Sequence, residues 1–208
     1  MAINSCFENF NQKFSQITSY SPKPGCESFA KEEFIRFRSI AATILKDLPD
    51  TATSSEARYI KHILLRSLLE NFFWLLYIFD DNLPSSWETK FNEYLKEFKI
   101  EYRTLYKEKF IPPEYKDEME PPDPSWDSLK GKKNIEQLLA DIHNCNGGTL
   151  KWIYFVYRFT SFDIHGKSLP SLFQSAFHKN CNFLVLKIDY TIELIADEYL
   201  SIFDKIKS

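Results

Sequence analysis

The sequence predicts an all-α protein, a bundle of about six to seven helices with one long, acidic, proline-rich loop. Apolar side chains recur at spacings of three and four residues through most of the 208 residues, which is the period of a helix. Proline and glycine separate these stretches. No stretch alternates apolar and polar residues as a half-buried strand does. The length suits one domain that spans residues 1–208.

Four helices are expected in the first half of the chain. Residues 3–17 and 27–47 form two amphipathic helices, which end at prolines. A third helix, capped by one of the hydroxyl residues at 53–55, runs to about Asp80. This helix is apolar nearly all round, which indicates a central, buried position. Residues 85–109 form a fourth helix, charged and amphipathic, with many glutamates beside lysines and arginines.

The second half begins with a break in composition and continues with three more helices. Residues 111–128 hold five prolines, six acidic residues and one lysine, so a long loop without helix is expected there. A short helix follows at 135–145. Thr149 can cap a strongly aromatic helix at 149–165, which Gly166 ends. After a loop with a proline, the last long helix covers 182–206.

Composition and charge exclude several functional classes. With only five glycines and no glycine-rich phosphate loop, nucleotide binding by such a loop is not expected. The net charge of −3 argues against indiscriminate binding to nucleic acid, so contact with RNA must be local. The longest apolar run has eight residues, far below the roughly 20 that span a bilayer. Four widely spaced cysteines and no secretory signal favour a cytoplasmic protein without a membrane segment.

A polar stripe on the aromatic helix is the first candidate site. Each helical residue advances by about 100°, so Tyr154, Arg158, Ser161 and His165 fall on one face. Arginine holds phosphate through paired hydrogen bonds, and histidine moves protons near neutral pH. Arg158 and His165 could therefore cleave a phosphodiester without a metal or other cofactor. The alternative is a structural polar cluster, because buried polar groups need partners whatever the protein does.

The central helix contains the second candidate, an Arg66–Glu70 pair at i, i+4. A charged pair in so apolar a helix is costly unless it serves packing specificity or a site. One interpretation is a buried ion pair to another helix. The other is that the central and aromatic helices pack together, so that Glu70 orients Arg158 or His165 and the two sets form one site.

The motifs also resemble known families. The sequence R-S-L-L-E at 66–70, P-S-W at 124–126 and Y-x3-S-x3-H-G from Tyr157 to Gly166 are similar to a family of all-helical bacterial proteins found near phage-defence genes. The spacing Arg158-x6-His165 resembles the R-x4–6-H motif of the HEPN superfamily (higher eukaryotes and prokaryotes nucleotide-binding domain). This resemblance implies a helical bundle that dimerises, and for many members a metal-independent endoribonuclease. It differs from that pattern at Phe159, where the ribonucleases usually have a polar residue.

Two other patterns have simpler explanations. His143 and Cys145, with His178 and Cys181, are zinc-type ligands, but their spacing is not that of a known zinc site, and no metal is expected. A basic stripe on the charged helix could face RNA, yet glutamates lie beside it. A solvated, ion-paired face is therefore the preferred interpretation of that stripe, which comprises Lys96, Lys99, Arg103 and Lys107.

Two hypotheses about function follow. The first is an endoribonuclease of HEPN type that acts as a toxin or defence effector. Arg158 and His165 would be catalytic, Tyr154, Tyr157, Ser161, Arg66 and Glu70 would support them, and a homodimer and an antitoxin or other regulatory protein would be partners. The second is a non-catalytic helical module that binds a protein partner or a small ligand, favoured by the 16% aromatic content, the acidic loop and Phe159.

Overall fold

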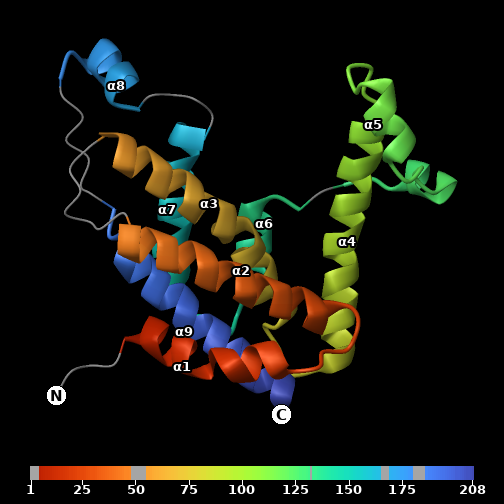
Figure 1. Ribbon diagram of the computed structural model, residues 1–208, viewed down its shortest axis with the longest axis horizontal. Coiled ribbons are helices and arrows are strands. Elements are labelled where there is room, and N and C mark those ends of the chain that lie inside the picture. Colours follow the sequence, from red (N-terminus) through yellow and green to blue (C-terminus); the bar gives the residue numbers. More distant parts are fainter. Residues whose placement is uncertain (1–4, 48–54, 132, 165–168, 180–185) are drawn as a thin grey trace.

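The computed structural model describes residues 5–47, 55–131, 133–164, 169–179 and 186–208 of the chain. Over these ranges the protein is all-helical, as predicted (Figure 1). The elements are α1 (Cys6–Ser19), α2 (Cys26–Asp47), α3 (Ser55–Ile78), α4 (Pro84–Tyr106), α5 (Pro113–Glu118), the 3-10 helix η1 (Pro124–Ser128), α6 (Ile135–Ala140), α7 (Gly147–Ile164), α8 (Leu169–Phe177) and α9 (Ile188–Lys207). No helix of the described residues is both long enough and apolar enough to cross a membrane.

Helix α3 is the centre of the bundle. It packs against α2, α4, α6, α7 and α9, and every residue from Phe72 to Asp80 is buried. The predicted central position of this helix is therefore confirmed, and its physical cause is the apolar surface that nearly surrounds its second half.

Aromatic side chains join α1, α2 and α9 into one layer. The ring centroid of Phe37 lies 5.2 Å from that of Phe10 on α1 and 5.1 Å from that of Tyr199 on α9, both in edge-to-face geometry. The Phe34 ring lies 5.0 Å from the same tyrosine. Edge-to-face packing is favoured by the quadrupoles of the rings, so these contacts stabilise the packing of α1, α2 and α9.

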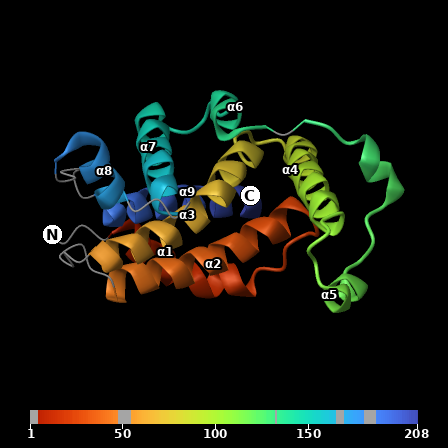
Figure 2. The same cartoon turned by 90° about the horizontal axis from the view of Figure 1, so that it is seen from above.

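Helix α4 and α8 lie at opposite ends of the molecule (Figures 1 and 2). The first turns of α4 are anchored in the core by Trp87 and Phe91, which are buried. Farther along the same helix, Phe98 is 53% exposed, and Phe110 beyond the helix is 97% exposed. Helix α4 therefore leaves the core along its length.

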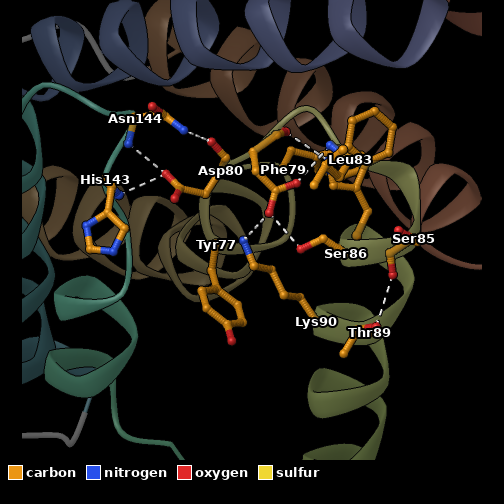
Figure 3. Close-up of polar contacts among 12 residues, drawn as sticks. Tyr77, Phe79, Asp80, Leu83, Ser85, Ser86, Thr89, Lys90, His143 and Asn144 are labelled. Carbon is orange, nitrogen blue, oxygen red and sulfur yellow. Dashed lines mark hydrogen bonds and ion pairs between the residues drawn. The ribbon is translucent and has the colours of Figure 1, made fainter.

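Two consecutive aspartates, Asp80 and Asp81, fix the corner between α3 and α4. Figure 3 shows the contacts of Asp80 with His143 and Asn144. The buried Asp80 carboxylate accepts the backbone N–H groups of His143 and Asn144 at 2.9 and 2.7 Å, which ties the end of α3 to the segment between α6 and α7. The Asp81 carboxylate accepts the Ser86 hydroxyl at 2.6 Å and the Lys90 ammonium at 3.1 Å. These bonds set the direction in which α4 starts.

The proline-rich segment 111–128 differs from the expected loop, because it contains α5 and η1. Both begin with proline at the first helical position, where the missing N–H has no partner in any case. The Asp123 carboxylate also caps η1 by accepting the Ser125 N–H at 2.8 Å. The expectation that prolines exclude helix here was wrong for short helices that start at a proline.

Two boundaries in the C-terminal half also differ from prediction. Helix α7 begins at Gly147, two residues before the expected cap Thr149, because the Asn146 side chain accepts the Gly148 N–H at 2.8 Å and the Thr149 N–H at 3.3 Å. Helix α8 occupies part of a stretch predicted as loop. The last helix was expected from residue 182, but residues 180–185 lie outside the described ranges and α9 begins at Ile188.

Candidate functional site

Helices α3 and α7 pack together and bring four of the predicted site residues into contact. The Arg66 guanidinium donates to Glu70 at 2.7 Å and to the Ser161 hydroxyl at 3.3 Å. It also stacks over the Tyr157 ring at 3.7 Å from the centroid, and the Tyr157 hydroxyl donates to Glu70 at 3.5 Å. The Arg66 side chain is only 12% exposed. Arg66 therefore links α3 to α7.

The other predicted residues of the stripe lie apart from this bridge. Tyr154 stacks parallel to Tyr157 at 6.2 Å, but its hydroxyl donates to Glu136 on α6 at 2.5 Å. Arg158 is exposed, and among the described residues it forms no ion pair or hydrogen bond. His165 lies outside the described residues, so its distance from Arg158 stays a prediction.

A second α3–α7 contact was missed in the sequence. His62 and Asp163 are 1% and 2% exposed, and the His62 Nδ1 lies 2.5 Å from an Asp163 carboxylate oxygen. The His62 ring also meets Phe159 edge-on, with 6.0 Å between centroids. The helical spacing of the sequence could have predicted that His62 is buried, because position 62 lies on the buried stripe that continues through Leu65. A buried polar pair of this kind links the two helices.

A pocket of about 360 Å³ lies beside the Arg66–Glu70 bridge, between α3, α4 and the segment that leads into α6. It lies where α4 leaves the core. Its lining combines aromatic rings with carboxylates, and it reaches Glu70 and Tyr157 of the bridge. The lining residues are Glu70, Asn71, Trp74, Tyr94, Glu97, Phe98, Glu101, Lys133, Asn134, Ile135 and Tyr157.

The aromatic wall of this pocket is held rigidly from behind. The Tyr94 ring lies 5.1 Å from Trp74 and 4.8 Å from Phe29. The Tyr94 hydroxyl donates to the Asn71 side chain at 2.9 Å, and Asn71 donates to the buried Glu33 at 3.0 Å. Burial, and then the charge of Glu33, raises the pKa of Tyr94 to about 12. Tyr94 is therefore neutral at physiological pH and presents a fixed ring.

Charged side chains of both signs line the pocket. Three glutamates, at positions 70, 97 and 101, and one lysine, Lys133, contribute to the lining. The Lys133 ammonium is engaged by Glu93 at 3.0 Å and Asp141 at 2.9 Å, and it also donates to the Tyr77 hydroxyl. Burial acts to lower the pKa of Lys133, but these hydrogen bonds outweigh it and the pKa is raised. Lys133 therefore stays charged and is already paired with acids.

Several of the remaining candidate groups have structural partners. The Cys145 thiol donates to Glu198 at 3.1 Å, and burial followed by this bond raises its pKa, which makes it a poor metal ligand. Cys181 lies outside the described residues. No cluster of three or more histidine, cysteine or acidic side chains suited to a metal ion occurs within the described ranges. In the basic stripe, Arg103 donates to the Trp126 carbonyl and Lys107 binds Asp127 at 2.6 Å, so η1 contacts these two residues of the stripe.

Comparisons of the chain with family models, with curated proteins and with solved structures found no match.

Proposed function

We propose that this protein is a helical ligand-binding module whose binding site is the aromatic pocket between α3 and α4. The observation that carries the proposal is a pocket of about 360 Å³ that combines an aromatic wall with polar and charged side chains. This volume falls within the range of small-molecule sites in proteins. The neighbouring Arg66–Glu70 pair supports a binding role over catalysis, since Arg66 is already bonded to Glu70 and Ser161.

The four tryptophans of the chain provide the test. Each indole N–H gives one resonance in a 15N-labelled protein, and the variant Trp74→Phe assigns the one in the pocket. A set of neutral, anionic and cationic small molecules is then titrated at millimolar concentration. We expect at least one compound to shift the Trp74 resonance saturably, while the resonances of the buried Trp87 and of Trp152, which is bonded to Thr191, stay in place. If no compound moves the Trp74 resonance, the proposal is wrong.

An endoribonuclease is the second candidate function, and the exposure of Arg158 favours it. A guanidinium without an ion-pair partner among the described residues is available to a phosphate group. Against this, Tyr154 of the stripe donates to Glu136 and the neighbouring Tyr157 donates to Glu70, and both acids repel a phosphodiester. This hypothesis keeps His165 as the general base, with a homodimer and a regulatory partner as its context.

Cleavage of single-stranded RNA in the presence of EDTA tests the ribonuclease hypothesis. It predicts products with 2′,3′-cyclic phosphate ends, loss of cleavage in Arg158→Ala and His165→Ala, and full cleavage in Lys151→Ala, which removes another exposed cation from α7. If the wild-type chain cleaves no RNA from a broad set of substrates, the enzymatic hypothesis is abandoned. The binding proposal is unaffected by that result.

A further inference from the structure

Trp74 contributes a buried hydrogen-bond donor to the lining of the α3–α4 pocket. Its side chain is only 5% exposed. The indole N–H of Trp87 donates to the Asp81 carbonyl at 2.9 Å, and that of Trp152 donates to the Thr191 hydroxyl at 3.0 Å. The Trp74 N–H, in contrast, has no acceptor among the described residues. Because a buried tryptophan usually finds a partner for this group, a ligand that carries an acceptor would be favoured here.

The charged side chains of the lining are already engaged by the protein. The Glu70 carboxylate accepts from Arg66 at 2.7 Å, and that of Glu97 accepts the Lys133 backbone N–H at 2.7 Å. The Lys133 ammonium has two acidic partners, and Glu101 also has an interaction partner. The pocket therefore offers no uncommitted charge of either sign. Since a charge that is buried without a partner is costly, an uncharged ligand matches this lining best.

The rings of the lining favour a flat ligand. The Trp74 and Tyr94 rings lie 5.1 Å apart between centroids and are tilted by 47°, and Phe98 is 53% exposed. Aromatic side chains pack well on other rings in offset and edge-on arrangements. The volume of about 360 Å³ is near the lower end of the range for small-molecule sites, so a compact ring system fits.

We propose that the α3–α4 pocket binds a compact, uncharged nitrogen heterocycle, which accepts a hydrogen bond from the Trp74 indole N–H through a pyridine-type ring nitrogen and packs against Tyr94 and Phe98. The lone pair of such a nitrogen lies in the plane of its ring, so one ligand can accept at its edge and pack with its faces. This inference rests on the proposed function, because it names the ligand class of the same pocket.

Two compounds, 7-azaindole and indole, test the inference. They have the same shape, are uncharged at neutral pH and differ at one ring position, where 7-azaindole has a pyridine-type nitrogen and indole has a C–H group. In calorimetric titrations of the full chain, we expect saturable binding of 7-azaindole and roughly fivefold to tenfold weaker binding of indole, which is the effect of one hydrogen bond. In the 15N-labelled chain, 7-azaindole should move the Trp74 indole proton downfield, as hydrogen bonding does, and indole should not.

Three variants assign the two parts of the interaction. Trp74→Phe removes the N–H donor and keeps a ring, so it should bind both compounds equally. Phe98→Leu removes an exposed ring and should weaken the binding of both compounds several-fold by the same factor. The matched control is Phe110→Leu, because the Phe110 ring is 97% exposed and lies outside the lining; this variant should bind as the wild type does. Added salt should leave the affinities unchanged, since screening acts on charges.

The outcomes separate the inference from the proposed function. Equal affinity of the wild type for both compounds would overturn the inference, and this comparison does not depend on the folding of any variant. A preference for 7-azaindole that persists in Trp74→Phe, or equal weakening by Phe110→Leu and Phe98→Leu, would also contradict it. If 7-azaindole fails to bind while another compound shifts the Trp74 resonance, the inference falls and the binding module stands. If no compound binds, both fall.

Discussion

Removing one member of the buried His62–Asp163 pair should destabilise the protein strongly. Both side chains are at most 2% exposed, so the variant Asp163→Ala leaves the imidazole in the core without its carboxylate partner. Breaking a buried pair in this way costs about 3–5 kcal/mol of the roughly 5–15 kcal/mol that stabilise a typical domain. For a chain of this length the melting temperature should fall by roughly 6–20 °C.

Urea denaturation followed by circular dichroism measures this loss. The variants Asp163→Ala and His62→Ala and their double variant form a cycle that isolates the interaction between the two side chains. The control is Asp204→Ala, which breaks an exposed ion pair with Lys13 and should cost at most about 1 kcal/mol. A loss below about 1 kcal/mol for Asp163→Ala would refute the claim that this buried pair stabilises the packing of α3 against α7.

Three further predictions concern particular side chains in the core and at the turns. Gly25 has φ +106° and an added Cβ would lie 2.8 Å from the Glu88 carboxylate, so Gly25→Ala should lower the melting temperature more than Gly131→Ala, where φ is +80° but space is open. The buried Tyr199 hydroxyl has no hydrogen-bond partner within the described residues, so Tyr199→Phe should leave the free energy of unfolding unchanged or raise it by about 1 kcal/mol in urea denaturation. Burial, and then the bond to Glu88, raises the pKa of Cys26 to about 12. The stabilisation by the neutral thiol is therefore complete below the unfolded pKa of about 8.5 and is lost as the pH rises toward 12. The free energy of unfolding of Cys26→Ser, measured by urea denaturation, should fall less steeply than that of the wild type across this pH range.

Much of the fold follows from local pattern. The central position of α3 was predictable because its second half has apolar residues on all sides, and such a helix has to be buried. The short helices α5 and η1 were not predicted, because prolines were counted as helix breakers without regard to position. At the first position of a helix the fixed φ of proline is favourable, and Pro113 and Pro124 are the first residues of α5 and η1.

The site was less accessible to prediction, because its parts come from separate helices. The i, i+4 spacing identified Arg66 and Glu70 as a pair, but their contacts with Tyr157 and Ser161 depend on how α3 and α7 pack. The aromatic pocket depends on the angle at which α4 leaves the core, which the bonds of Asp81 help to set. No local pattern reports that angle. His62 was overlooked because a single histidine among apolar residues gives no sign of its partner 101 residues away.

A titration of the 15N-labelled chain with the set of neutral, anionic and cationic small molecules, followed at the indole N–H of Trp74, tests the central claim most directly. With at least one compound the resonance should move along a saturable curve while those of Trp87 and Trp152 remain in place. Small, unsaturating shifts shared by every indole, or a Trp74 resonance that no compound moves, would contradict a ligand site in the α3–α4 pocket.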